Sequence, residues 1–243
     1  MEPKLEPLPV SEQAAGRGIV YQDAQQTAVA LGAQKVLRNT YLLLALTMVP
    51  TLIGAFVGMA TSGFVIQYPL ASTLVMLTGV VGLQFGIAAN RNNGLGVALL
   101  LLMTGILGWW LGPILNFALQ LKNGMQLVGY AAVGTAVIFF AMGAIATAAK
   151  RDFSFMGKFL FVGMIALLVA MIANMFLQIP ALALTISTLV IVVFSLFLIY
   201  DLNRIVRGGE TNYVMAATGV YISLYNIFAN LLILLMALAG DRR

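Results

Sequence analysis

Asp201 is the acidic residue whose position singles it out for chemistry. It lies near the end of a long apolar run, within the segment Phe197–Glu210. An ionisable group at membrane depth is costly unless it is paired or hydrated, so Asp201 is a candidate for an ion or proton site. Alternatively, Asp201 is a boundary carboxylate that pairs with Arg204, three residues further along the same helix face. Position alone does not separate these two interpretations.

The residue types that the chain lacks exclude most enzyme chemistry. There is no Cys and no His, which removes thiolate or imidazole metal sites, Cys nucleophiles and Ser-His catalysis. An aspartyl protease within a membrane needs two carboxylates at membrane depth, and only Asp201 qualifies. We therefore expect no catalytic residue, no cofactor and no resident metal, and hence a protein that is not an enzyme.

Other polar and small residues inside the apolar runs have simpler interpretations. Interhelical hydrogen bonding is the common use of amides in such runs, and we expect it for Gln84, Asn116, Asn174, Asn226 and Asn230. Glycines recur at four-residue spacing in the pairs Gly54/Gly58, Gly82/Gly86 and Gly108/Gly112. Such pairs let helix backbones approach closely, and we favour packing within the chain over dimerisation.

The elements that position these residues are membrane-spanning helices. The 243 residues are 61% hydrophobic and 9% charged, with a mean hydropathy of +0.99, which excludes both a soluble domain and a disordered chain. Crossing a bilayer takes about 20 apolar residues in a helix. Seven segments qualify: Tyr41–Ala60, Leu70–Ala89, Leu95–Ile114, Leu127–Ala149, Phe159–Leu177, Ala181–Leu202 and Tyr213–Ala239. The short loops between them predict an all-α, seven-transmembrane-helix bundle.

The charged residues predict the domain division and the orientation. Residues 1–36 are polar, contain three prolines and lack the apolar region of a signal peptide, so we expect a flexible cytoplasmic tail before a transmembrane domain at residues 37–243. With the N-terminus inside, ten Lys and Arg residues fall on the cytoplasmic side and three outside, as the positive-inside rule requires. Seven spans then place the C-terminus in the periplasm. The net charge of +5 fits contact with anionic lipid better than nucleic-acid binding.

Several segments give the chain a resemblance to a known family. They are KVLRNTYLLLAL (residues 35–46), LGPILN (111–116), RDFSFMG (151–157), ANMFLQIPAL (173–182), GGETNY (208–213) and SLYNIF (223–228). In these segments the chain resembles the Bax inhibitor-1 family, in its bacterial branch named after YccA. The resemblance implies seven transmembrane helices with the last one central. It also implies residence in the inner membrane and association with the AAA protease FtsH and its prohibitin-like companions.

The same resemblance raises a second activity, a pH-sensitive calcium leak. Several family members are described as leaks gated by two aspartates that face each other on the sixth and seventh helices. The first aspartate corresponds to Asp201, but the second position falls on Ser223. Two close carboxylates titrate as a coupled pair, and calcium prefers several oxygen ligands. A single Asp201 that accepts a hydrogen bond from the Ser223 hydroxyl lacks both properties.

The sequence therefore supports one leading hypothesis and one rival. The leading hypothesis is an inner-membrane protein that binds FtsH and restrains its proteolysis of membrane proteins. Its expected contacts are the tail and the loop that carries Lys150, Arg151, Asp152 and Lys158. The rival is a calcium or proton leak through the bundle, with Asp201, Ser223 and Arg204 on the ion path.

Overall fold

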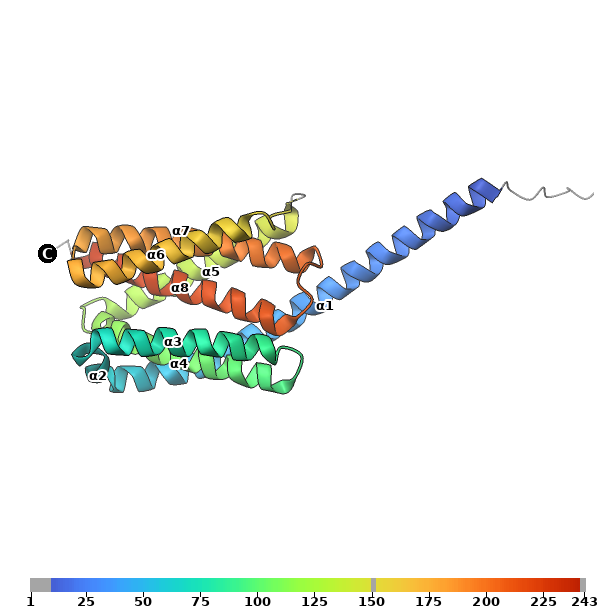
Figure 1. The fold of residues 1–243 in the computed structure, drawn as a ribbon. Coiled ribbons are helices and arrows are strands. Elements are labelled where there is room, and N and C mark those ends of the chain that lie inside the picture. Colours follow the sequence, from blue (N-terminus) through green and yellow to red (C-terminus); the bar gives the residue numbers. More distant parts are fainter. Residues whose placement is uncertain (1–9, 150–151, 241–243) are drawn as a thin grey trace, which may run out of the picture.

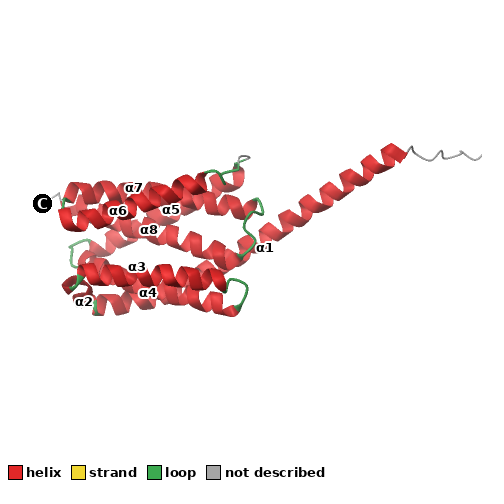
Figure 2. Ribbon diagram, in the orientation of Figure 1, coloured by secondary structure: helices red, strands yellow, loops and turns green. Residues whose placement is uncertain are grey.

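The protein is a bundle of long helices (Figures 1 and 2). The computed structural model describes residues 10–149 and 152–240, with side-chain environments from residue 30 onward. The helices are α1 (Val10–Ala60), α2 (Ser62–Gln67), α3 (Pro69–Ala89), α4 (Gly94–Leu119), α5 (Gly124–Ala148), α6 (Met156–Leu177), α7 (Pro180–Val206) and α8 (Tyr213–Gly240). Within the described residues, seven of them, all but α2, are long and apolar enough to span a bilayer. The predicted seven-helix membrane bundle is confirmed.

Helix α1 differs most from its predicted span. It begins at Val10 and leaves the bundle as a single continuous helix (Figure 1), whereas the sequence predicts a flexible tail up to residue 36. Residues 10–36 contain no proline and many Ala and Gln residues, which have good helix propensity. The tail's first nine residues lie outside the described part of the chain, and the division at residue 36 stays a prediction. The short helix α2 was not predicted.

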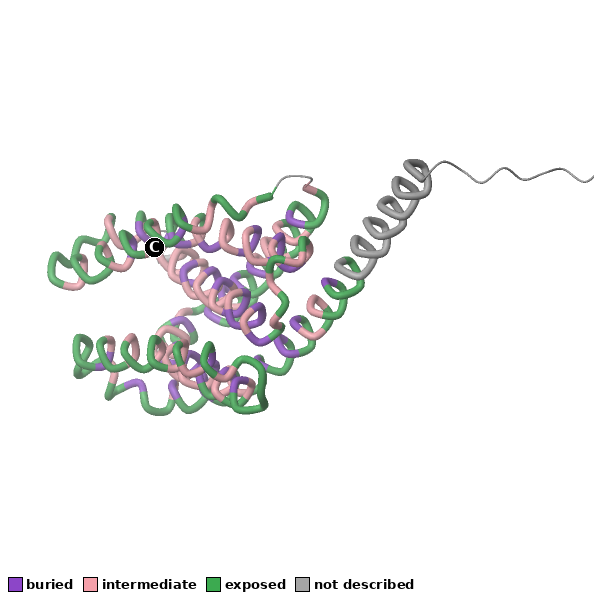
Figure 3. Tube along the Cα trace, turned by 45° about the vertical axis from the view of Figure 1, so that its right-hand side comes forward, coloured by how far each residue is buried: buried purple, intermediate pink, exposed green. Residues whose placement is uncertain are grey.

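The helices form two groups that meet along α8. In the first group α1 and α3 pack on α4, and in the second α5 and α6 pack on α7. Helix α8 packs against α7 and α5 and also against α1, α4 and α3. From Tyr213 to Ala239, only Tyr213 and Leu238 are exposed, and the buried positions gather along this helix (Figure 3). The last helix is therefore central, as predicted.

Glycine lets α1 and α4 pack backbone against backbone. A Cβ added at Gly58 would collide with the carbonyl oxygen of Trp109, and one added at Gly108 would collide with that of Thr51. Gly54 and Gly112 are equally crowded by the opposite backbone. These glycines serve packing within the chain, because lipid gives helices no hydrophobic drive to associate and close packing must replace it.

The third glycine pair, on α3, is different. A Cβ added at Gly82 would meet nothing within 4 Å, and one at Gly86 would lie 3.2 Å from Cδ1 of Leu99. Gly82 therefore faces away from the bundle and offers a matched comparison with the glycines of the α1–α4 contact.

Two identical substitutions should move stability in opposite directions. Gly58→Ala should lower the free energy of unfolding by about 1–3 kcal/mol, because the new methyl group forces α1 and α4 apart. Gly82→Ala should raise it by about 0.5–1 kcal/mol, because alanine restricts the unfolded chain at an uncrowded helix position. Thermal unfolding of the purified variants in detergent measures both. Equal effects would contradict the packing described for α1 and α4.

Candidate functional site at the basic end of the bundle

Three loops meet at one end of the bundle. They are the α3–α4 loop (residues 90–93), the α5–α6 loop (149–155) and the α7–α8 loop (207–212), and α1 enters the bundle at the same end. Six of the seven described Lys and Arg side chains lie here: Lys35, Arg38, Arg91, Lys158, Arg204 and Arg207. The seventh, Lys122, lies at the opposite end. We call this end the basic end.

Asp201 lies on α7 below the basic end, against the central helix. It is partly buried and sits five residues before the end of α7, roughly 8 Å at 1.5 Å per residue. A Cβ added at Gly219 of α8 would lie 2.7 Å from its Oδ2 atom. The absence of a side chain at Gly219 thus makes the space for the Asp201 carboxylate.

Ser223 shares this interface but does not bind Asp201. It lies one turn beyond Gly219 on the same face of α8 and is 2% exposed. Among the described residues, no hydrogen bond joins Asp201 to Ser223. The expected hydrogen bond between the two side chains is therefore not formed in this structure, although α7 and α8 bring both residues to one contact.

Arg204 pairs with Glu210 rather than with Asp201. Its Nη2 atom lies 3.3 Å from Oε2 of Glu210, and both side chains are partly exposed. The α7–α8 loop makes this possible: Gly208 has a φ of 72°, and the backbone N–H groups of Gly209 and Glu210 donate to the carbonyl oxygen of Arg204. A positive φ suits glycine. The described residues contain no direct ion pair between Asp201 and Arg204, because the loop returns Glu210 to the arginine.

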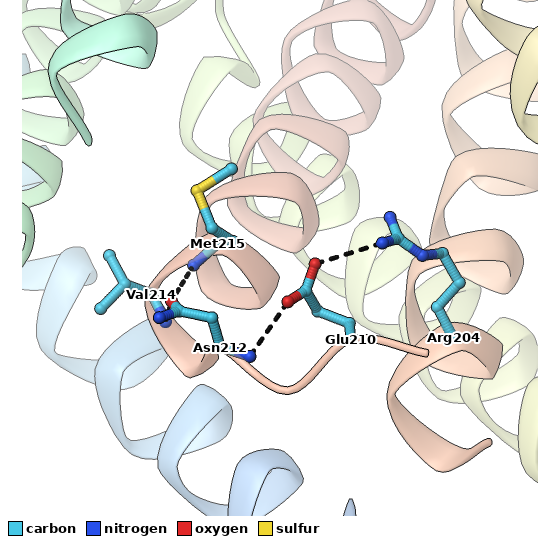
Figure 4. A network of polar contacts seen from close by, with 5 residues as sticks. All are labelled: Arg204, Glu210, Asn212, Val214 and Met215. Carbon is cyan, nitrogen blue, oxygen red and sulfur yellow. Dashed lines mark hydrogen bonds and ion pairs between the residues drawn. The ribbon is translucent and has the colours of Figure 1, made fainter. Parts of the chain in front are cut away.

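Asn212 connects this loop to α8 and to the α3–α4 loop, and Figure 4 shows its contacts with Glu210 and with the start of α8. Its Oδ1 atom accepts from the backbone N–H groups of Val214 (3.0 Å) and Met215 (3.1 Å), which caps α8. Its backbone N–H donates to Oε1 of Glu210 at 3.0 Å. Its Nδ2 atom donates to the α3–α4 loop, to the carbonyl oxygen of Arg91 and to Oδ1 of Asn92, both at 2.9 Å.

Asn203 makes the corresponding connection to the α5–α6 loop. It is 1% exposed, and its Oδ1 atom accepts from the backbone N–H of Phe153 at 3.2 Å. Its Nδ2 atom donates to the carbonyl oxygen of Ala146 at 3.1 Å. Arg207 adds a hydrogen bond to the carbonyl oxygen of Ala149 at 3.3 Å. The end of α7 is thereby fastened to the loop that precedes α6.

The loop predicted to contact a partner is only partly described. Lys150 and Arg151 lie outside the described residues, whereas Asp152 and Lys158 are exposed. Oδ1 of Asp152 accepts from the backbone N–H of Ser154 at 2.8 Å. Hydrogen bonds from the Ser154 side chain and backbone lower the pKa of the Asp152 carboxyl, because they favour its ionised form. Asp152 is therefore a charged, accessible group at neutral pH.

The amides expected to bond between helices behave differently from one another. Asn116 does so, since its Nδ2 atom donates to the Ser62 hydroxyl of α2 at 2.9 Å. Asn226 and Asn230 instead donate to carbonyl oxygens one turn earlier in α8, each at 2.8 Å, and Asn174 accepts from the N–H of Ile179 just beyond its own helix. Within the described residues, no group of three or more acidic side chains is placed to hold a metal ion.

Asn203 and Asn212 were not singled out from the sequence. Asn212 lies inside the GGETNY segment, and an Asn just before an apolar run is an ordinary helix-cap signal, so its capping role could have been found. The partners of its Nδ2 atom lie about 120 residues away and follow only from the fold. The same holds for Asn203, whose partners are about 50 residues earlier in the chain.

These features define a polytopic α-helical membrane protein with a central last helix and a polar loop cluster at one end. The profile of the family described as "Inhibitor of apoptosis-promoting Bax1" matches residues 33–240. The chain therefore belongs to the Bax inhibitor-1 family, which confirms the predicted resemblance. It is 40% identical over 205 residues to the "Modulator of FtsH protease YccA" of Escherichia coli K12, covering 84% of this chain and 91% of that one. It is 38% identical to an "Uncharacterized membrane protein" of Vibrio cholerae, over 84% and 90% of the two chains.

The two kinds of polar contact at the basic end should differ in strength. Asn203→Ala should lower the free energy of unfolding by about 1–3 kcal/mol, because it leaves buried backbone groups without their partner. Arg204→Gln should cost less than about 1 kcal/mol, because its ion pair with Glu210 is partly exposed and screened by solvent. Thermal unfolding in detergent, with both variants measured beside the unaltered protein, checks the order. A larger loss for Arg204→Gln would refute it.

Proposed function

We propose that the protein is an inner-membrane modulator that binds an FtsH-type AAA protease and restrains its proteolysis of membrane proteins. The observation that carries this proposal is the 40% identity to the FtsH modulator of Escherichia coli K12 across nearly the whole of both chains. A sequence relative in another strain of the same species is described as "Inner membrane protein YccA". This description supports the proposal that the present protein also resides in the inner membrane. The proposal includes association with the prohibitin-like companions of the protease, because the resemblance to the Bax inhibitor-1 family implies it.

The proposed orientation places the basic end in the cytoplasm. Six of the seven described cationic side chains lie at that end, as the positive-inside rule requires. The protruding part of α1 and the α5–α6 loop, with Lys150, Arg151, Asp152 and Lys158, then face the cytoplasmic side. The C-terminus, after seven spans, faces the periplasm.

The proposed mechanism depends on a contrast in stability along α1. Its first part leaves the bundle (Figure 1), and a helix without tertiary packing is marginally stable in water. An AAA motor needs a segment that unfolds readily in order to begin pulling. From Gly54 to Gly58, in contrast, α1 is packed backbone to backbone against α4. The protease would engage the protein readily and extract it slowly, and other substrates would be spared meanwhile.

Deleting residues 2–30 should separate binding from degradation. The truncated protein should have a longer lifetime in cells with active protease, because the motor loses its starting segment, and it should still copurify with the protease. A second membrane substrate should then be degraded more slowly, because the modulator persists. The measurement is a chase of the full-length and truncated proteins beside that substrate, with copurification from detergent as the binding assay. A strain without the protease is the control.

Each failure of this experiment has a distinct meaning. Without copurification of the full-length protein, the proposed partner is wrong. If the truncated protein binds but disappears as fast as the full-length one, the starting segment lies elsewhere. If it persists and the second substrate is degraded at its normal rate, the protein is a substrate and not an inhibitor.

A calcium or proton leak is the alternative function. The observation that favours it is a carboxylate, Asp201, inside a span and against the central helix beside Gly219. Ser223 stands on the same face of α8, one turn deeper, where family leaks are described as carrying a second aspartate. One carboxylate cannot form a coupled pair, so we expect little calcium flux from the protein as it is.

Ser223→Asp should create the missing pair. In liposomes, the variant should show a calcium flux that depends on pH, because two close carboxylates share a proton. Adding Asp201→Asn to that variant should abolish the pH dependence, and Ser223→Asn serves as a control that adds volume without charge. Calcium-sensitive dye inside the liposomes reports the flux. A strong pH-dependent flux from the unaltered protein would instead favour the leak as its function.

A further inference from the structure

Two side chains, Asn212 just before α8 and Tyr221 on α8, carry the described side-chain hydrogen bonds from the central helix to the first helix group, α1, α3 and α4. Two turns into α8, the Tyr221 hydroxyl lies 2.8 Å from the Thr51 hydroxyl of α1 and donates to the carbonyl oxygen of Thr104 of α4 at 3.3 Å. At the basic end, Nδ2 of Asn212 donates to Arg91 and Asn92 of the α3–α4 loop. The other side-chain hydrogen bonds between helices in the described residues, such as Asn116 to Ser62 and Asn203 to Ala146, stay within one group.

The rest of the contact between α3 and α8 is sparse. Helix α3 packs mainly on α4 and touches α8 at few positions, and its outer face is exposed, with Val75 and Phe85 both 74% exposed. Asn212 therefore supplies the described side-chain hydrogen bonds between the α3–α4 loop and the start of the central helix, beside the apolar packing of the hairpin. Because Asn92 and Arg91 are themselves exposed, water can replace these bonds, and the connection can open without leaving buried polar groups unpaired.

We propose that Asn212 is a latch that holds the α3–α4 hairpin against the central helix at the basic end of the bundle. When the latch is closed, Val214 and Ala217 on the first turns of α8 are fully buried. When it opens, the α3–α4 hairpin separates from α8 at this end, while Tyr221 still binds Thr51 of α1 and Thr104 of α4. The α7–α8 loop fixes the latch through Glu210, which binds both the Asn212 N–H and Arg204.

The two atoms of the Asn212 side-chain amide have separable roles, which makes the latch testable. Oδ1 caps α8 and Nδ2 holds the α3–α4 loop. Asn212→Asp keeps an oxygen for the cap and adds a negative charge that a helix N-terminus favours. It also places an acceptor opposite two acceptors, the Arg91 carbonyl and Oδ1 of Asn92. If Asn212 only caps α8, this variant should be as stable as the original or more so. If Asn212 is a latch, the α3–α4 hairpin should separate from α8 at the basic end in this variant.

The experiment uses the absence of Cys from the chain. Spin labels on Arg91→Cys and Lys158→Cys, both at exposed positions in different helix groups, report the distance across the basic end. A single Ala217→Cys, one turn before Tyr221 on the same face of α8, reports access by its rate of reaction with a water-soluble maleimide. Asn93→Ala is the matched control, because Asn93 bonds only within its own loop and the start of α4.

In Asn212→Asp, the label distance should lengthen and broaden, and Ala217→Cys should react about tenfold faster, as the loss of two hydrogen bonds of ordinary strength implies. Asn93→Ala should change neither. Asn212→Ser, which keeps a capping oxygen and lacks the amide donor, should behave as Asn212→Asp does and serves if the aspartate variant does not fold. Unchanged distance and rate in both Asn212 variants would overturn the proposal, as would an equal change in Asn93→Ala.

Discussion

The direct packing of α1 on α4 is the contact on which the rest of the bundle depends. Lipid is as apolar as the side chains, so transmembrane helices gain little by hiding apolar surface from it. The α1–α4 pair is held instead by backbones in contact at Gly54, Gly58, Gly108 and Gly112. This pair forms the platform that α8 meets through the hydroxyl of Tyr221. A methyl group at these glycines would therefore disturb both the α1–α4 contact and the surface of α1 and α4 on which α8 packs.

Polar side chains then determine how the second helix group joins this platform. In the described chain these side chains lie on α8, in the loop before it and at the end of α7. Tyr221 reaches α1 and α4, Asn212 reaches the α3–α4 loop, and Asn203 reaches the α5–α6 loop. Unpaired polar groups are costly inside a bilayer. These residues therefore specify which loops and helices meet, whereas the many apolar side chains at the same contacts allow several arrangements.

The chemistry available at the basic end favours recognition over catalysis. It combines exposed cationic side chains, a charged Asp152 on a short turn and a helix that leaves the bundle. Asp201, the acidic side chain within a span, is accommodated by Gly219 rather than matched with a second acid. The proposed modulator needs an accessible surface on the cytoplasmic side and a bundle that resists extraction, and the exposed charges of the basic end and the α1–α4 packing support that proposal.

The sequence by itself determined the class, the seven spans and the family, because about 20 apolar residues per span and short loops between the spans leave few alternatives. It also identified the glycines of the α1–α4 contact. It did not reveal that Gly82 faces outward, that α1 continues as a helix to Val10, or that Arg204 binds Glu210 rather than Asp201. Only the tertiary structure decided these points and the roles of Asn203 and Asn212. Their partners are set by how helices far apart in the chain rotate against one another, and hydropathy does not encode that rotation.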